Sequence, residues 1–480
     1  MRASLLSLLL LSFVASFAPN GLSQSAPPAA PAANSATSLS KKMTAGIDTA
    51  AEKILTETGV PSASLAVVQQ GRIVYSHAYG KARLEPPVIA TAEMRYEIGS
   101  VSKQFTAAAL LLLQEEGKVQ LDDPVAKYLP DLTRAGEVTL RMILSHTSGY
   151  QDYWPQDYVM QPMLQPVSTA HILETWAKKP LDFDPGTQWQ YSNTNFVIAA
   201  AVIEKASGQP YFRFIQSRIL DPLGIHSAID ADTGVPMVAD AEGYYRHALG
   251  PLRPAPKEGQ GWMFGAFELA MTPRDLALWD ISLINRSLLK PDSYAQMFTS
   301  FKLKDGTDTH YGLGVFTSPR AGHAAVSHSG EASGFVSDNV VFPADHVAIA
   351  VFTNQDASSA ASSIAHEVMD LLLPAALVSA SGSGESEALA IFTGLQGGKI
   401  DRRLLTPNCS AYFSQQALDD YSSSLQPLGS PTSFRLLREE SRGGMTQRIF
   451  RAEFPTRRLI INAYVMPDGK YEQYLVAPTE

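Results

Sequence analysis

The stretch Glu97-Ile-Gly-Ser-Val-Ser-Lys-Gln-Phe105 places Ser100 and Lys103 three positions apart, directly before a long apolar run. Thr106 to Leu113 is almost wholly apolar, which predicts a helix that is buried on most sides and begins near Ser100. Positions three apart share a helix face, so the lysine amine can reach the serine hydroxyl. A serine hydroxyl is a poor nucleophile unless a neighbouring base accepts its proton, and a helix N-terminus favours developing negative charge. The stretch therefore predicts a nucleophilic serine with an amine partner.

The spacing alone is weak evidence, because the same Ser-x-x-Lys pattern occurs at two other places. Ser38 and Lys41 repeat it in a Pro/Ala-rich segment, and Ser287 and Lys290 repeat it near the end of a later predicted helix. Short motifs arise by chance, and an ordinary helix start with a solvated lysine explains a single one equally well. The rest of the chain has to distinguish these interpretations.

The composition is that of a globular protein with an excess of acidic residues. Of 480 residues, 45% are hydrophobic and 18% are charged, which excludes a disordered chain and allows two or three domains. The net charge of −9 argues against binding to nucleic acid or to an anionic membrane surface. The single cysteine, Cys409, excludes an internal disulfide and is predicted to be a small buried residue rather than a reactive thiol.

Residues 1–25 have the pattern of a secretory signal peptide. Arg2 is the only charged residue before position 41, and the apolar run Leu5–Phe17 is short for a membrane span. We expect cleavage between Ala18 and Ala26, followed by a disordered Pro/Ala/Ser linker at residues 26–42. An uncleaved anchor is the alternative. The expected location is secreted or periplasmic, without stable membrane insertion.

Predicted strands lie towards both ends of residues 43–378, and predicted helices lie between them. Residues 43–57 have the spacing of an amphipathic helix, and a hairpin is predicted around Gln69-Gln-Gly71. The predicted strands are 63–68, 72–79, 313–317, 324–328, 335–342 and 347–354, and the predicted helices include 169–178, 194–206, 211–219 and 368–378. We therefore expect an α+β fold. Both ends of the segment build one antiparallel sheet flanked by helices, and an all-helical domain is inserted between them.

A serine- and glycine-rich linker at residues 379–386 separates a smaller α+β unit at residues 387–480. Helical patterns continue to about Leu425, and four strands are predicted at 433–437, 447–454, 459–465 and 471–476. The unit resembles the small helix-and-curved-sheet domains of the nuclear-transport-factor-like kind, and it contains no catalytic set. An accessory role and self-association through this unit are both open.

Tyr191 and Asn193 lie on a predicted turn that follows Asp184-Pro-Gly186 and opens a buried helix. A tyrosine there could lose its proton to a neighbouring lysine and relay it. An asparagine offers both a donor and an acceptor to a substrate amide or ester. Alone, this Tyr-x-Asn pattern is more often a turn with a helix cap.

An apolar strand is predicted to end in His328-Ser329-Gly330-Glu331. Glycine lets a strand backbone approach a bound substrate. The N–H of Glu331 could pair with that of Ser100 to hold an oxyanion. A strand histidine by itself is more often a structural hydrogen-bonding group than a catalyst.

Together the three patterns resemble the serine β-lactamase and penicillin-binding-protein superfamily, especially its class-C-like branch. That branch includes D-alanyl-D-alanine carboxypeptidases, D-aminopeptidases and esterases. The family motifs are Ser-x-x-Lys, Tyr-x-Asn and Lys- or His-[Ser/Thr]-Gly, and the last two occur here once each, downstream of Ser100. The resemblance covers about residues 43–378. Further stretches that look like the family are Leu121–Pro124, Ile143–Gly149, Asp221–Gly224, Met271–Asp275 and Tyr311–Gly314.

The resemblance implies a role for each motif residue. Ser100 is the nucleophile that becomes acylated, and Lys103 and Tyr191 share the proton transfers, with the identity of the base left open. The N–H groups of Ser100 and Glu331 are the implied oxyanion donors. The residues implied in substrate binding are Asn193, His328, Ser329, Gly330 and Glu331.

The third motif carries His328 where β-lactamases mostly have lysine. Histidine is only partly charged near neutral pH, which weakens the case for efficient β-lactam hydrolysis. The expected function is therefore hydrolysis of an amide or ester in a small-molecule or peptide substrate, of the peptidase or esterase type. A slow penicillin-binding sensor or scaffold that keeps the fold is the alternative.

Other hydrolase classes fit less well. The ten histidines contain no His-x-His or His-Glu-x-x-His pattern, so no metal is expected, and no cofactor is needed. A Gly-x-Ser-x-Gly elbow is absent, which counts against an α/β-hydrolase. His146 is expected to fix a loop, and Tyr150, Tyr153 and Trp154 are expected to pack in the helical domain rather than to wall the cleft.

Overall fold

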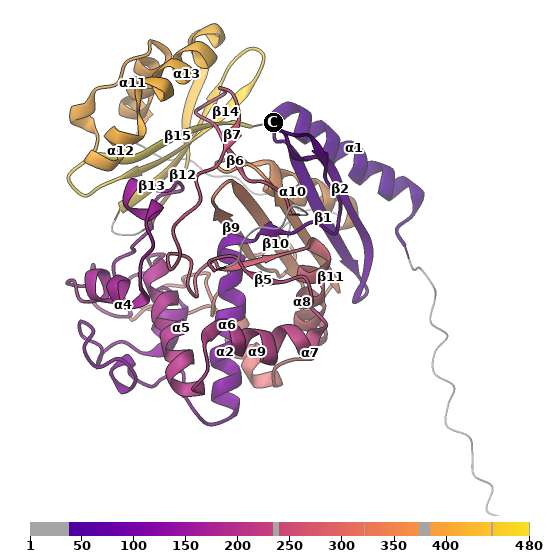
Figure 1. Cartoon of the computed structure of the whole chain (residues 1–480), viewed down its shortest axis with the longest axis vertical. Coiled ribbons are helices and arrows are strands. Elements are labelled where there is room, and N and C mark those ends of the chain that lie inside the picture. The colour runs from indigo at the N-terminus through magenta and orange to yellow at the C-terminus, as the bar shows by residue number, and fades with distance from the viewer. Residues whose placement is uncertain (1–37, 234–239, 321, 374–384, 443–444, 480) are drawn as a thin grey trace, which may run out of the picture. The chain divides into compact units, whose positions relative to one another are not determined.

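The structure is a computed structural model that describes residues 38–233, 240–320, 322–373, 385–442 and 445–479 (Figure 1). The predicted signal peptide and most of both predicted linkers lie outside these residues. Among the helices within the described ranges, none combines the length and the apolar character that a membrane span requires.

A six-stranded antiparallel sheet joins the two ends of residues 43–378. The strand order is β3-β2-β1-β11-β10-β9, and β1 pairs with β11 so that Leu65 lies opposite Val351. The strands are β1 (Ser62–Gln69), β2 (Arg72–Arg83), β3 (Val88–Ile89), β9 (Val326–Ala332), β10 (Phe335–Phe342) and β11 (Val347–Thr353). This pairing confirms the sheet that was expected from both ends of the segment.

Both faces of this sheet are buried, because successive side chains of its central strands point into two hydrophobic cores. Leu65 and Val67 point to the face that α1 (Lys41–Thr58) and α10 (Ala360–Leu372) cover. Ala66 and Val68 point to the opposite face, which α8 (Pro273–Asn285) covers. The sheet is therefore a rigid support between two helical layers (Figure 1).

Helix α2 (Lys103–Glu115) lies in the larger core and is buried from Lys103 to Leu113. It follows the 3₁₀ turn Gly99–Ser102 and packs against α5 (Asn193–Ser207), as the apolar run predicts. The other helices here are α3 (Leu140–Leu144), α4 (Thr169–Ile172), α6 (Tyr211–Ile215), α7 (Asp221–Leu223) and α9 (Pro291–Phe298). The short strands are β4 (Tyr96–Glu97), β5 (Ile229–Asp230), β6 (Tyr244–Tyr245), β7 (Arg253–Pro254) and β8 (Leu269–Met271).

The prediction of a strand at residues 313–317 is wrong. The backbone groups there bond to separate partners: the N–H of Leu313 donates to the carbonyl of Met297 (3.0 Å), and that of Gly314 donates to Leu144 (3.0 Å). No continuous ladder can form when neighbouring N–H groups serve different elements.

The final helix of this segment also differs from its prediction. Helix α10 begins at Ala360 rather than near residue 368, and it ends at Leu372. Its first turns contain alanine and serine, and the buried alanines pack on the sheet without forming an obvious apolar stripe. Because these side chains are small, the hydrophobic periodicity did not indicate the first half of the helix.

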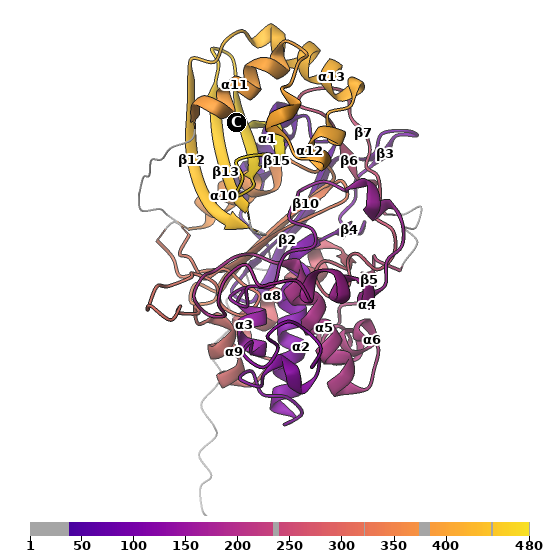
Figure 2. The same cartoon turned by 90° about the vertical axis from the view of Figure 1, so that its left-hand side faces the viewer.

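Residues 385–479 form a separate hydrophobic core, to which Ala248 of the preceding segment also contributes. Helices α11 (Glu385–Gln396), α12 (Pro407–Tyr412) and α13 (Gln415–Leu425) pack on one face of a four-stranded antiparallel sheet (Figure 2). Its strands are β12 (Ser433–Arg442), β13 (Met445–Glu453), β14 (Arg458–Val465) and β15 (Tyr471–Thr479), which confirms the predicted strands. Cys409 is buried in this core, as expected, and burial raises the pKa of its thiol.

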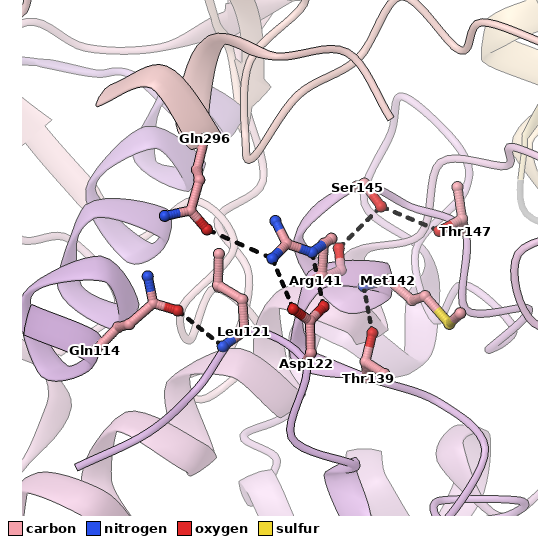
Figure 3. A network of polar contacts seen from close by, with 9 residues as sticks. All are labelled: Gln114, Leu121, Asp122, Thr139, Arg141, Met142, Ser145, Thr147 and Gln296. Carbon is pink, nitrogen blue, oxygen red and sulfur yellow. Dashed lines mark hydrogen bonds and ion pairs between the residues drawn. The ribbon is translucent and has the colours of Figure 1, made fainter. Parts of the chain in front are cut away.

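A polar network joins Leu121–Pro124 to Ile143–Gly149 (Figure 3). The Arg141 guanidinium donates two hydrogen bonds to the Asp122 carboxylate, at 2.8 and 2.9 Å. The N–H of Leu121 donates to the Gln114 side chain on α2 (2.9 Å). Because the Asp122 carboxylate is largely exposed, this pair orients the loop more than it stabilises the fold. The network places the loop that carries His146 next to α2.

Candidate active site

Ser100 and Lys103 are in direct contact on the turn that leads into α2. Lys103 Nζ lies 2.8 Å from Ser100 Oγ, 2.8 Å from Asn193 Oδ1 and 3.1 Å from the carbonyl oxygen of Ala266. The lysine side chain is fully buried, whereas Ser100 is partly exposed. The Asn193 and Ala266 oxygens thus hold the lysine amine beside the partly exposed hydroxyl of Ser100.

Aromatic rings complete the surroundings of the lysine amine. Nζ lies 4.8 Å from the ring centroid of Phe267, 4.9 Å from that of Tyr191 and 5.4 Å from that of Phe196. A cation over a ring face is stabilised by the ring quadrupole, and this partly offsets the loss of water. The rings also restrict the amine to the position beside Ser100.

Asn193 is the first residue of α5, and its side-chain amide forms hydrogen bonds within the protein. Oδ1 accepts from Lys103, while Nδ2 donates to the Trp154 carbonyl (2.9 Å) and to Asp152 Oδ2 (3.2 Å). Asp152 Oδ1 also accepts from the Asn193 backbone N–H (2.9 Å). The geometry therefore gives Asn193 a part in positioning Lys103, beside its predicted contact with substrate.

His146 holds the turn that presents Tyr191. Its Nδ1 accepts from the Ser192 N–H (3.2 Å), and its backbone carbonyl accepts from the Gln190 N–H (3.0 Å). The imidazole and the Tyr191 ring lie with centroids 4.3 Å apart. His146 thus fixes a loop by hydrogen bonds, as expected, and sets the position of the phenol.

Two glycines allow strand β9 to cross close to the Ser100 turn. A Cβ added to Gly330 would lie 2.0 Å from the Ile98 carbonyl oxygen, and one added to Gly99 would lie 2.5 Å from the Glu331 nitrogen. Gly99 also has a φ of 53°, in the left-handed region that side chains disfavour. The crossing brings the backbone of Glu331 beside that of Ser100, which a two-donor oxyanion site requires.

We expect Gly330→Ala to impair both folding and activity. The added methyl group would overlap the Ile98 carbonyl, so the strand or the turn must move. Overpacking of this kind costs about 1–3 kcal/mol, and a shift of the oxyanion donors should lower kcat at least about 100-fold. Urea denaturation and ester hydrolysis measure the two effects. Gly136→Ala is the matched control, since no atom lies within 4 Å of its added Cβ. Wild-type kcat in Gly330→Ala would contradict the assignment of this crossing.

His328 is buried in the cavity wall and is neutral. Its Nδ1 lies 2.6 Å from the Ser329 carbonyl oxygen, which can only accept, so Nδ1 carries the hydrogen. Nε2 then accepts from the Tyr311 hydroxyl (2.9 Å). Burial, with the Lys103 charge as a second cause, lowers the pKa of His328 to about 3. The expected partial charge at neutral pH is therefore corrected to no charge.

The depressed pKa of His328 predicts a pH dependence of stability. The unfolded chain binds a proton at this imidazole below about pH 6.5, whereas the folded chain does so only near pH 3. Stability should fall as the pH drops between these values, by on the order of 2 kcal/mol at about pH 5. Urea denaturation at about pH 7 and pH 5 measures this loss, and it should be smaller in His328→Gln. Equal losses in both proteins would show that His328 is not neutral in the fold.

A cavity of about 240 Å³ opens above these groups. Its walls include Trp154, Phe267 and Phe316. Lys103 lies beneath the floor, in contact with Ser100. Of the residues predicted from the sequence, those that line the cavity are Ser100, Tyr191, Asn193, His328, Ser329, Gly330 and Glu331. The structure thus gathers all three motifs at one site.

Sequence reasoning missed several residues that this site uses. Asp152 orients Asn193, the Ala266 carbonyl holds Lys103, and the Tyr311 hydroxyl donates to His328. Trp154 was expected to pack in the helical domain, and it also lines the cavity. Tyr311 begins a stretch that resembles the family, which was the available indication of its role. The role of the Ala266 carbonyl cannot be recognised in a sequence, because every residue has a backbone carbonyl.

A comparison with family models decides the family. The Beta-lactamase model matches residues 47–373, well over half of the chain. The chain belongs to the beta-lactamase family. Members with this fold include serine hydrolases, and the three motifs at one cavity make this chain a serine hydrolase of the family. The resemblance stated from the sequence is confirmed.

Relatives within the beta-lactamase family give a range of activities. A D-aminopeptidase of Gluconobacter oxydans (strain 621H) is 26% identical over 302 residues, which span 61% of this chain and only 56% of that enzyme. A D-stereospecific amidohydrolase from Streptomyces sp. is 26% identical, with a TM-score of 0.59 over 69% of this chain and 98% of that one. An octameric penicillin-binding protein homologue from Pyrococcus abyssi, 22% identical, has a TM-score of 0.60 over 91% of this chain and 96% of that one. This last similarity supports the fold alone.

Proposed function

We propose that this member of the beta-lactamase family is an exported hydrolase that cleaves an amide or ester through an acyl-enzyme on Ser100. The observation that carries the proposal is the 2.8 Å contact between Lys103 Nζ and Ser100 Oγ at a cavity floor. An amine in that position can take the hydroxyl proton as the oxygen attacks.

The proposed reaction has two halves. Ser100 Oγ forms a bond to the acyl carbon while its proton passes to Lys103 or Tyr191, and the N–H groups of Ser100 and Glu331 stabilise the oxyanion. The bond to the leaving amine or alcohol then breaks, and the leaving group takes the proton. A water molecule attacks the acyl-enzyme with the same base, which releases the acid and restores Ser100.

The neutral His328 supports a peptidase or esterase rather than an efficient β-lactamase. A lysine in the third motif would present a fixed positive charge to a substrate carboxylate, whereas this imidazole carries none. Similarity to a D-aminopeptidase and to a D-stereospecific amidohydrolase supports amides and peptides of D-amino acids as first candidate substrates.

A hydrolysis panel followed by mass spectrometry tests the proposed function. The panel contains nitrocefin, a peptide ending in D-Ala-D-Ala, a D-amino-acid amide and short-chain esters. We expect turnover of at least one amide or ester, with nitrocefin the slowest. If nitrocefin labels Ser100 covalently and no substrate of the panel is converted to a released product, the penicillin-binding sensor or scaffold would be favoured instead.

The export part of the proposal depends on residues 1–25 and places the protein outside the cytoplasm, in the periplasm or the medium. N-terminal sequencing of the protein after expression in a bacterium with its native leader tests it. We expect a mature chain that starts between Ala18 and Ala26. An intact Met1 in the cytoplasmic fraction would contradict export.

Self-association through residues 385–479 is a second part of the proposal. The similar homologue from Pyrococcus abyssi is octameric by its description, and its chain aligns with 91% of this one. Light scattering on the purified protein gives the mass in solution. A monomer at micromolar concentration would exclude it.

A further inference from the structure

The loop that follows Trp154 is bonded to the C-terminal sheet through Asp157. One carboxylate oxygen, Oδ2, accepts from Asn462 Nδ2 (2.6 Å), the Tyr464 hydroxyl (2.6 Å) and Gln473 Nε2 (3.1 Å). The Asp157 backbone N–H donates to Gln473 Oε1 (2.6 Å). Hydrogen bonds to an ionised carboxylate are among the stronger ones in proteins. One aspartate therefore ties the loop to strands β14 and β15.

The residues on either side of Asp157 reinforce this connection. The Gln156 side chain donates to the Glu472 carboxylate, and the Tyr158 hydroxyl donates to the Glu472 carbonyl oxygen (3.0 Å). Gln156 and Glu472 are both buried. Three consecutive loop residues are thus bonded to the C-terminal sheet.

Asp157 contacts the face of the C-terminal sheet that lies opposite the helices. Ile461 and Ala463 of β14 belong to the core that α11, α12 and α13 cover, so their neighbours Asn462 and Tyr464 point the other way. Polar side chains on that second face bond to one another: Gln447 Nε2 donates to Asn462 Oδ1 (3.0 Å). The face is organised before any ligand binds.

The same residues line the cavity above Ser100. Its wall includes Gln156, Asp157 and Tyr158 from the loop. Three residues of the C-terminal sheet line the same cavity: Arg438, Gln447 and Asn462. The catalytic segment and the C-terminal sheet therefore share one cavity.

We propose that the C-terminal sheet is a subsite of the catalytic cavity for peptide-like substrates, that is, for polar chains that extend beyond the scissile bond. Arg438, Gln447 and Asn462 would contact that extension, and Asp157 is a positioning residue that holds the loop wall against the sheet. The guanidinium and the amides suit the carbonyl and carboxylate oxygens of a peptide. This inference rests on the proposed function of Ser100.

Two ester substrates test the subsite. One is p-nitrophenyl acetate, whose short acyl group ends near Ser100. The other is a depsipeptide whose scissile ester carries two D-alanyl residues on each side. In Asp157→Asn we expect kcat/KM for the depsipeptide to fall about tenfold or more, mainly through KM, because the loop wall loses a charge-assisted anchor. The fall in kcat/KM for the acetate should be clearly smaller, because the acetate does not reach the C-terminal sheet.

Two further variants keep the test decisive. Arg438→Gln changes an exposed residue of β12 that lines the cavity, and it should also raise KM for the depsipeptide several-fold. Asp305→Asn, which changes an exposed loop carboxylate, is the matched control and should change neither substrate. Thermal unfolding of each variant shows that it is folded.

The outcomes separate the two proposals. Equal effects of Asp157→Asn and Arg438→Gln on both esters, or no effect on the depsipeptide, would overturn the subsite. Failure of the wild-type protein to hydrolyse either ester or any amide or ester of the panel, with no acyl group on Ser100, would instead overturn the proposed function on which the subsite rests.

Discussion

Replacing Ser100 by alanine should abolish turnover of a chromogenic ester, with a loss on the order of 10⁴-fold or more. In the proposed reaction the acyl-enzyme forms on Ser100 Oγ, which lies 2.8 Å from Lys103 Nζ. The mass increase caused by a serine-directed phosphonate should disappear in the same variant. Ester hydrolysis and intact-protein mass spectrometry measure the two results.

The chain contains its own control for this experiment. Ser287 and Lys290 repeat the Ser-x-x-Lys spacing, but Ser287 lies exposed beyond the end of α8. Ser287→Ala should keep full activity and full labelling. The assignment fails if Ser100→Ala hydrolyses the ester at the wild-type rate or still gains the phosphonate mass.

Replacing Lys103 by alanine should lower kcat/KM by about 10³-fold or more, because nucleophile and base act as a unit. The change also leaves Asn193 Oδ1 and the Ala266 carbonyl without their donor, which costs about 1–3 kcal/mol of stability for each buried acceptor. Steady-state kinetics and urea denaturation separate the two effects. Lys290→Ala, in the exposed second Ser-x-x-Lys sequence, is the control and should change neither kcat/KM nor the free energy of unfolding.

A rescue experiment distinguishes a catalytic amine from a structural one. The truncation leaves a space beside Ser100, so added propylamine should restore part of the kcat of Lys103→Ala, increasingly at high pH where the amine is neutral. A purely structural lysine would give a variant of low stability whose kcat does not respond to the amine. Activity close to wild type in Lys103→Ala without any amine would refute its role.

Much of the fold follows from local patterns in the chain. The almost wholly apolar run from Thr106 to Leu113 predicts a helix buried on most sides, and α2 is buried from Lys103 to Leu113. Two runs of strand-forming residues divided by Gln69-Gln-Gly71 predict the hairpin of β1 and β2, and runs divided by turn residues predict the four C-terminal strands. The same logic failed at residues 313–317, where each backbone group bonds to a different element. Local periodicity cannot report such partners.

The chemistry of the motif residues is also readable from the chain, but their environment is not. Ser100 and Lys103 are near neighbours on one turn, so their contact follows from helix geometry. The charge state of His328 depends on its burial, and its tautomer depends on Tyr311. Neither can be read from the order of residues along the chain. Likewise the use of Asn193 by Lys103 arises only when α2 and α5 pack together.

The chain's own residue order predicts a serine with an amine partner, because residues three apart share a helix face, and it predicts strands towards both ends of residues 43–378. The family followed from the resemblance of three separate motifs to those of known proteins. Which groups surround that serine is a property of the folded protein. Asp157 meets Asn462 and Tyr464 because two separately built cores come together, and no local pattern encodes a contact between residues so far apart in the chain. Long-range packing thus determines what the cavity can admit.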